Sequence, residues 1–175
     1  LFTIAKGLTS AYAPLSGTIV SDKMWQVLER GTDENGPIGH GWTYSAHPIG
    51  AAAGVANLRL LDTLGLIDNA GTVGAELNAK MRAALADHPH IGDIRGEAMI
   101  CAVEFVKDKA DRVFYDPAAK IGPQIAAKLL EQDQIIARAM PQGDILGFAP
   151  PFCLTAQEAD RIITATARAV KAVLG

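Results

Sequence analysis

The sequence predicts an α/β layer followed by a smaller α+β domain. Up to about residue 64, two apolar runs rich in strand-forming residues alternate with helical patterns, which is typical of an α/β layer. From residue 65 onward the expected order is helix, strand, strand, helix, strand, strand, helix, which favours a separate α+β domain. We therefore divide the chain into residues 1–64 and residues 65–175, with the long helix before the boundary as the bridge.

The composition is that of a globular protein with an ample core. Hydrophobic residues make up 49% of the 175 residues, charged residues make up 20%, and the formal net charge is −3. This balance lacks the basic footprint that nucleic acid or an anionic membrane surface requires, so we expect neither partner. Residues 49–56, the longest apolar stretch, are too few to span a bilayer. Cys101 and Cys153 are expected to be free, mostly buried thiols in a reducing cytoplasm.

The first residues favour a fragment of a longer polypeptide. The chain opens on Leu1 with an apolar run and has no initiator Met. Because a domain rarely begins in the middle of a strand, we expect an N-terminal part of the same protein to be missing.

The first 64 residues are expected to hold two strands and two helices. Residues 1–5 and 16–21 are predicted to be buried strands. Asp22 is expected to cap a helix that runs to about residue 30, where Gly31 stops it. A second helix is predicted from Pro48 to Leu64, since Pro is tolerated in a first turn. Its helically spaced apolar residues predict a small-residue face that a helix or loop approaches closely: Ile49, Ala52, Ala53, Ala56, Leu60 and Leu64.

The remaining elements follow from their periodicity. Residues 69–87 and 118–132 are predicted to be amphipathic helices, and residues 91–94 and 99–106 to be strands. Residues 134–139 and 144–149 are expected to pair as strands joined by residues 140–143. Thr155 is expected to cap the last helix, whose apolar stripe includes Ile163 and Val170.

The Lys6-Gly7 pair at the end of the first strand is the first candidate for chemistry. A lysine at a strand end, flanked by a flexible glycine, can turn its amine into a cleft and attack a carbonyl. Taken alone, such a lysine is more often a solvated surface residue.

Two motifs around this lysine change that interpretation. Thr3-Ile4-Ala5-Lys6-Gly7 leads into a small-residue turn and Tyr12-Ala13-Pro14, and the block GHGWTYSAHP at 39–48 precedes an alanine-rich helix. Together they resemble the Schiff-base lysine segment and the cofactor block of class III pyridoxal-phosphate-dependent aminotransferases of the omega-transaminase type. The similarity continues through residues 93–96 and 143–145 to 150–151. The resemblance covers essentially the whole chain.

The resemblance implies a fold for each part. Residues 1–64 would be the C-terminal end of the large domain of the aspartate-aminotransferase-like fold, including the interdomain helix, and residues 65–175 its small α+β domain.

The resemblance implies roles for four residues. Lys6 would form the internal aldimine with pyridoxal 5'-phosphate and then shuttle a proton between the substrate carbon and the cofactor. Thr43 would bind the cofactor phosphate through its hydroxyl and backbone N–H, reaching it from the partner subunit of a homodimer. Trp42 would line the substrate pocket beside the subunit boundary. Arg138 would pair its guanidinium fork with a substrate carboxylate.

The resemblance also implies which groups lie outside this chain. In the family, the acid that pairs with the pyridine nitrogen, the phosphate-binding glycine loop and the aromatic that stacks on the ring all precede the lysine. We therefore expect the fragment alone to be inactive, and the parent protein to be a dimer or a dimer of dimers. His40, His47, His88 and His90 have no spacing typical of a metal site, so no metal is expected, and His47 is expected to pack at the helix entrance.

Three functions remain open at this stage. The first is a transaminase that moves an amino group from an amine or omega-amino acid to pyruvate or a similar oxo acid. The second is an aminomutase on the same scaffold. The third is a non-catalytic dimerisation fragment, because the Thr43 block and the alanine-rich helix would lie at a dimer interface.

Overall fold

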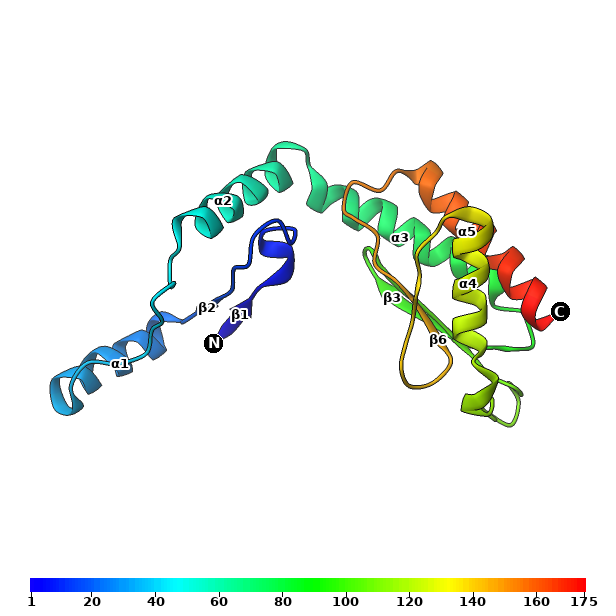
Figure 1. Cartoon of the computed structure of the whole chain (residues 1–175), viewed down its shortest axis with the longest axis horizontal. Coiled ribbons are helices and arrows are strands. Elements are labelled where there is room, and N and C mark those ends of the chain that lie inside the picture. The colour runs from blue at the N-terminus through cyan, green and yellow to red at the C-terminus, as the bar shows by residue number, and fades with distance from the viewer. The chain divides into compact units, whose positions relative to one another are not determined.

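The computed structural model describes residues 1–175 and groups them into two compact units, Leu1–Leu64 and Gly65–Gly175 (Figure 1). We refer to them as unit 1 and unit 2. Their assignment to the end of a large domain and to a small domain stays a prediction.

Unit 1 contains a two-stranded antiparallel sheet and two long helices. Strands β1 (Phe2–Ile4) and β2 (Gly17–Ile19) pair with Phe2 opposite Ile19. The short 3₁₀ helix η1 (Lys6–Leu8) lies in the connection between them, and α1 (Asp22–Asn35) and α2 (Pro48–Thr63) follow. The positions of the strands agree with the sequence analysis.

The expectation that these strands are buried is wrong for this unit. Phe2 is 65% exposed and Ile19 is 54% exposed. The strands pair only with each other, and no helix of the unit packs closely over the faces of this sheet. Their apolar composition is therefore displayed on the surface of unit 1.

Helix α1 is longer than predicted. It begins at Asp22, its N-cap is Ser21 rather than Asp22, and it passes through Gly31 before it ends at Asn35. A glycine inside a helix costs only about 1 kcal/mol relative to alanine, which does not stop a helix. Gly36 has a φ of +83°, a left-handed value that favours glycine and ends the helix.

Helix α2 begins at Pro48 as predicted, but it buries a different face. Its buried residues are Gly50 and Gly54, whereas Ile49 is 70% exposed and Leu60 is 53% exposed. A Cβ at Gly50 would lie 3.2 Å from the carbonyl oxygen of Pro14. The close approach of a loop is confirmed, and glycines rather than the predicted apolar stripe permit it.

Unit 2 is a four-stranded antiparallel sheet with three long helices. Its elements are α3 (Leu66–Leu85), β3 (Ile91–Glu97), β4 (Ile100–Phe105), η2 (Pro117–Ala119), α4 (Ile121–Asp133), β5 (Arg138–Ala139), β6 (Ile145–Phe148) and α5 (Ala156–Leu174). The strand order is β3-β4-β6-β5. Apart from the short η2, this is the predicted order of helices and strands. None of the helices in the chain has the length and apolar composition needed to cross a membrane.

One face of the sheet packs against the helices and forms the core of unit 2. Alternate residues of β4 and β6 are buried, as expected when a sheet is covered on one side: Cys101, Val103, Phe105, Leu146 and Phe148. They join residues of α3, α4 and α5 in one cluster. The residues of β4 and β6 on the other face are partly or fully exposed, and they include Ile100, Ala102, Glu104, Ile145 and Gly147.

Several details of unit 2 correct the expectations. Strand β5 has only two residues, because Gln134 adopts a left-handed φ of +56° at the end of α4 and the strand begins four residues later. Cys101 is buried as expected, and burial raises the pKa of its thiol to about 11. Cys153 is exposed, so the expectation of buried thiols holds for only one of the two.

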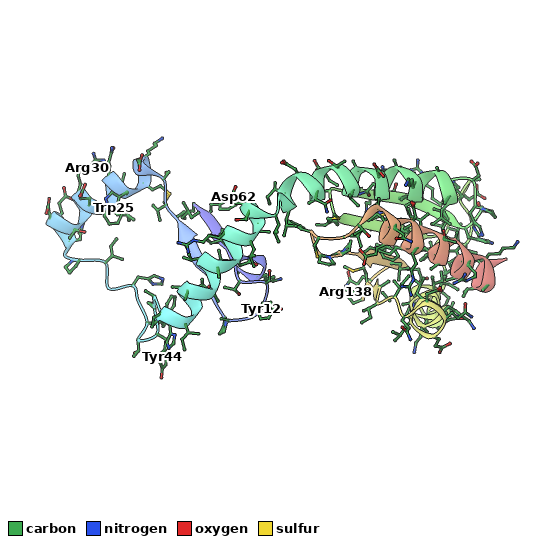
Figure 2. All side chains as sticks on the ribbon, turned by 90° about the horizontal axis from the view of Figure 1, so that it is seen from above. Tyr12, Trp25, Arg30, Tyr44, Asp62 and Arg138 are labelled. Carbon is green, nitrogen blue, oxygen red and sulfur yellow. The ribbon has the colours of Figure 1, made fainter.

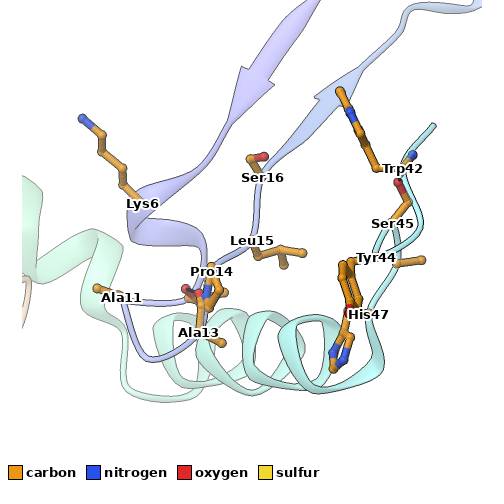
Figure 3. A pocket seen from close by; sticks show the side chains of 12 residues that line it. Lys6, Ala11, Ala13, Pro14, Leu15, Ser16, Trp42, Tyr44, Ser45 and His47 are labelled. Carbon is orange, nitrogen blue, oxygen red and sulfur yellow. Dashed lines mark hydrogen bonds between the residues drawn. The ribbon is translucent and has the colours of Figure 1, made fainter. Parts of the chain in front are cut away.

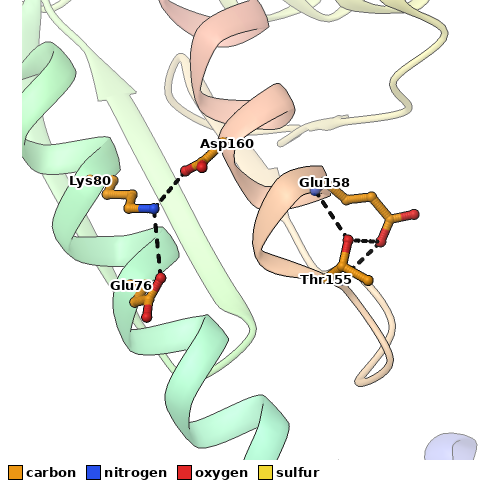
Figure 4. A network of polar contacts seen from close by, with 5 residues as sticks. All are labelled: Glu76, Lys80, Thr155, Glu158 and Asp160. Carbon is orange, nitrogen blue, oxygen red and sulfur yellow. Dashed lines mark hydrogen bonds and ion pairs between the residues drawn. The ribbon is translucent and has the colours of Figure 1, made fainter.

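The start of α5 confirms the predicted cap. The Thr155 hydroxyl accepts from the backbone N–H of Glu158, and the Glu158 carboxylate accepts from the Thr155 N–H at 2.9 Å (Figure 4). Nearby, Lys80 on α3 binds Asp160 on α5 at 2.7 Å. The capping box stabilises the first turn of α5, and the Lys80–Asp160 ion pair joins α5 to α3.

Candidate functional site

A cavity of unit 1 lies between the η1 turn and the segment that enters α2. Its volume is about 800 Å³, which is within the range of small-molecule sites. The residues with functional groups on its wall are Lys6, Thr9, Ser16, Trp42, Tyr44, Ser45 and His47. Two of the four predicted site residues, Lys6 and Trp42, therefore line one cavity.

Lys6 lies where the sequence places it, directly after strand β1. It is the first residue of η1, has a φ of +50°, and its side chain is exposed. In Figure 3 the side chain extends away from Tyr44 and His47, with its amine free of the other labelled residues. The amine is thus available to a reagent that enters from solvent.

The backbone around Lys6 is held from α2. The side-chain amide of Asn57 donates to the carbonyl oxygens of Gly7 at 2.9 Å and Leu8 at 3.2 Å. Beside it, a Cβ at Gly54 would lie 3.1 Å from the Leu15 side chain. The sequence analysis missed Asn57, because a single asparagine inside a helix carries no motif.

The turn before α2 presents the aromatic wall of the cavity. The Trp42 N–H donates to the Ser45 hydroxyl at 3.1 Å, and the Ser45 N–H donates to the Trp42 carbonyl at 2.9 Å. Trp42 is 73% exposed and Tyr44 is 80% exposed. Figure 2 shows Tyr44 at the turn before α2. His47 is exposed and is the N-cap residue of α2, so it is not the packing residue that we expected.

Thr43 lies in this turn, between two residues of the cavity wall. It is exposed and does not itself line the cavity. Its expected role, binding the phosphate of the opposite subunit, does not require it to face this cavity, and that role stays a prediction.

Arg138 belongs to unit 2 and lies on the open face of the sheet. Across the neighbouring strands of the sheet, Arg138 pairs with Gly147, Gly147 pairs with Ala102, and Ala102 pairs with Arg95. Arg95 binds Asp93 at 2.9 Å and Glu104 at 2.8 Å, and these carboxylates raise its pKa, with the Asp93 hydrogen bond as the larger cause. Arg138 forms no such ion pair, so its guanidinium is free for another anion.

The donor set of the cavity suits an aromatic aldehyde that carries a phosphate. Lys6 supplies a primary amine, Ser16 and Ser45 supply hydroxyls, and Trp42 and Tyr44 supply aromatic faces. The wall contains no aspartate or glutamate. An acid to pair with a pyridine nitrogen would therefore come from residues outside this cavity wall.

Comparison with known sequences gives a consistent set of relatives. Residues 1–170 match the family described as Aminotransferase class-III. The chain is 58% identical over 173 residues to the diaminobutyrate–2-oxoglutarate transaminase of Halomonas elongata, covering 99% of this chain and 37% of that protein. It is 36% identical over 165 residues to the putrescine–pyruvate aminotransferase of Pseudomonas aeruginosa, covering 94% of this chain and 34% of that protein. The chain thus spans about a third of the length of these relatives.

Solved structures agree with the sequence relatives. A structure from the directed evolution of transaminases by ancestral reconstruction is 54% identical, with a TM-score of 0.95 over 98% of this chain and 37% of that one. An (S)-enantioselective omega-transaminase from Thermomicrobium roseum is 36% identical, with a TM-score of 0.88 over 99% of this chain and 37% of that one.

Proposed function

The chain belongs to the class III aminotransferase family, and from that membership we propose that it supplies the cofactor-binding lysine and part of the substrate pocket of a transaminase. The observation that carries this proposal is Lys6, which follows strand β1 and lines a cavity together with Trp42 and Tyr44. Enzymes of this family depend on pyridoxal 5'-phosphate.

The cofactor, when bound, supplies an aldehyde that captures amines and an electron-poor ring that stabilises charge on the substrate carbon. Lys6 would hold it by forming a bond from Nζ to the aldehyde carbon, with loss of water. The Lys6 amine would also accept the proton that the substrate carbon loses and return it to the product.

Two residues of the turn before α2 would complete the binding surface. Thr43 would donate its hydroxyl and N–H to the phosphate of the cofactor in a second subunit, and its exposure leaves both groups accessible. Trp42 would form the wall of the substrate pocket. Its ring lies edge-on to His40 with the ring centroids 4.8 Å apart, which supports a fixed orientation.

Arg138 would recognise a substrate carboxylate. It is exposed on the open face of the sheet and lacks the ion pairs that engage Arg95. Gly147 beside it has no side chain, and Ala102 in the next strand has only a methyl group. The space over Gly147 is bounded by the Met140 side chain, whose Sδ would lie 3.7 Å from a Cβ at that position.

The reaction would be amino transfer in two half-reactions. The donor would be an amine or an omega-amino acid, and the acceptor would be pyruvate or a similar oxo acid. The names of two relatives support this class of substrates, since one pairs diaminobutyrate with 2-oxoglutarate and the other pairs putrescine with pyruvate.

The remaining parts of the site would come from other residues of the complete enzyme and from a second subunit. Unit 1 exposes large apolar side chains that a partner surface would cover: Phe2, Trp25, Trp42, Tyr44, Ile49 and Leu58. We propose a homodimer or a dimer of dimers. We also propose that residues 1–175 alone do not catalyse transamination, because the cavity wall holds no acid for the pyridine nitrogen.

The experiment compares amino transfer by the complete enzyme and by two lysine variants. Lys6→Ala should lower kcat by at least about 100-fold, because proton transfer by a positioned base contributes that much or more. Lys23→Ala removes an exposed lysine at the start of α1 and should leave kcat unchanged. Equal activity of both variants would refute the proposal. Return of the amino group to the donor itself, with no transfer to any oxo acid, would indicate an aminomutase instead.

A further inference from the structure

The loop that carries Lys6 has an unusual backbone. Lys6 and Ser10 both have a φ of +50°, and Ala11 has a φ of +64°. Left-handed values are unfavourable for residues with a Cβ, and they persist only where the surroundings determine the conformation. Three such residues within six positions therefore require a strong external support.

Two of the four backbone hydrogen bonds within residues 5–12 are long. The N–H of Thr9 reaches the Lys6 carbonyl at 3.3 Å, and the N–H of Ser10 reaches the Gly7 carbonyl at 3.4 Å. Both distances are longer than those of ordinary N–H···O bonds. The Thr9 hydroxyl donates to the Ala13 carbonyl at 2.5 Å, which closes the loop on itself but anchors it to nothing outside.

Asn57 on α2 supplies the external support. Its Nδ2 donates to the carbonyls of Gly7 at 2.9 Å and Leu8 at 3.2 Å, and its Oδ1 accepts from the Ser10 hydroxyl at 2.7 Å. Both the nitrogen and the oxygen of the side-chain amide therefore form hydrogen bonds with the loop. No other side chain from outside the loop forms a hydrogen bond with residues 6–12.

The place of Asn57 on α2 explains how it reaches the loop. It lies one turn after Gly54 and two turns after Gly50, on the one face of the helix that is buried. A Cβ at Gly54 would lie 3.1 Å from the Leu15 side chain. The glycines bring the loop against the helix, and Asn57 binds the carbonyl groups that then face it.

We propose that Asn57 is the positioning residue for Lys6. It does not touch the cofactor, and it acts by fixing the two carbonyl groups that follow Lys6 in the chain. Its amide thereby holds the left-handed conformation from which the Lys6 side chain departs. The inference rests on the proposed function of Lys6 as the attachment point of pyridoxal 5'-phosphate.

The test uses three variants of the complete enzyme. Asn57→Ala removes all three hydrogen bonds. Asn57→Asp keeps the size and the acceptor for Ser10, but it loses both donors and places a carboxylate oxygen against two carbonyl groups. Ser10→Ala is the matched control, because it removes the hydroxyl and leaves both carbonyl bonds in place.

The first measurement is hydrogen exchange without cofactor. Peptides that cover residues 5–13 should exchange roughly tenfold faster or more in both Asn57 variants, since two hydrogen bonds are lost. Ser10→Ala should change this rate by much less. Peptides from residues 66–174 should be unchanged, since unit 2 contains none of these contacts.

The second measurement is the rate at which Lys6 captures pyridoxal 5'-phosphate, trapped by borohydride and located by peptide mapping. Capture should slow roughly tenfold in both Asn57 variants and be nearly normal in Ser10→Ala. Unchanged capture in Asn57→Asp would overturn the proposal. Faster exchange throughout the chain, or loss of the folded enzyme in both Asn57 variants, would mean a general structural role and would also overturn it.

The same data distinguish this proposal from the proposed function. If the unaltered enzyme carries no label on Lys6, the proposed function fails. The exchange of residues 5–13 would still report whether Asn57 holds the loop.

Discussion

Gly74 in α3 offers the sharpest test of packing in unit 2. A Cβ at this position would lie 2.2 Å from the carbonyl carbon of Ala98 and 2.7 Å from the Met99 nitrogen. Ordinary contact begins at 3.4 Å, so in Gly74→Ala the turn between β3 and β4 must retreat by about 1 Å. The turn is backbone and is held by Asn78, whose Nδ2 donates to the Ala98 carbonyl at 3.0 Å.

The expected loss of stability follows from three opposing effects. Overpacking costs about 1–3 kcal/mol, and loss of the Asn78 hydrogen bond costs about 1 kcal/mol. Replacing glycine by alanine inside a helix returns about 1 kcal/mol. The net destabilisation for Gly74→Ala is about 1–3 kcal/mol, which corresponds to roughly 5- to 150-fold faster exchange of the most protected amides.

The assay is hydrogen exchange of residues 66–105, because both tryptophans lie in unit 1 and do not report on unit 2. Gly71→Ala is the matched control, since a Cβ at Gly71 of the same helix meets nothing within 4 Å. This control should slow exchange through its higher helix propensity. Equal behaviour of the two variants would show that α3 does not approach the turn as described.

Three further predictions concern the cap of α5, the histidine pair and the substrate specificity. Thr155→Ala removes the capping box and should destabilise unit 2 by about 1 kcal/mol in urea denaturation, whereas an unchanged midpoint would contradict the role of the cap. Burial, and to a smaller extent the charge of His90, lowers the pKa of His88 below 6.5. Because the unfolded chain then binds the proton more tightly, this contribution to stability is complete above about pH 6.5 and is lost as the pH falls through the folded pKa. His88→Asn should reduce the change in the free energy of unfolding between pH 7 and pH 5. An unaltered change would mean that other groups cause it. Arg138→Ala should lower kcat/KM of the complete enzyme for carboxylate-bearing substrates by roughly 10- to 100-fold and spare simple monoamines, so equal losses for both would refute carboxylate recognition.

The elements of unit 2 could be predicted because the apolar residues that form their sequence patterns are the residues that the unit itself buries. The helical stripe with Ile163 and Val170 and the apolar strand with Val103 face a core that lies wholly inside the unit. Local periodicity is then sufficient to identify both the element and its buried face. The strand before Arg138 was overestimated, because the apolar residues 135–137 follow a left-handed Gln134 and do not enter the sheet.

Unit 1 shows where the same reasoning fails. Phe2 and Ile19 have the composition of buried strands, yet a two-stranded sheet has no neighbour in the unit to bury them. In α2 the contact face consists of glycines, which carry no hydrophobic signal. Sequence patterns report which residues favour burial, and they do not state what covers them.

The candidate site shows the same division. Lys6 and Trp42 were found through their motifs, and the structure places both on one cavity wall. Asn57 was missed, because its partners lie 49 and 50 residues away and an isolated polar residue in a helix has no periodic signature. Contacts between side chain and backbone over such distances become visible only in the folded chain.

The most direct test of the central claim is to locate the cofactor on the complete enzyme. Borohydride reduction of the enzyme loaded with pyridoxal 5'-phosphate, followed by peptide mapping, should yield a single labelled residue, Lys6. The exposed Lys23 serves as the internal control and should remain unlabelled. A label on any other lysine, or none on Lys6, would contradict the account.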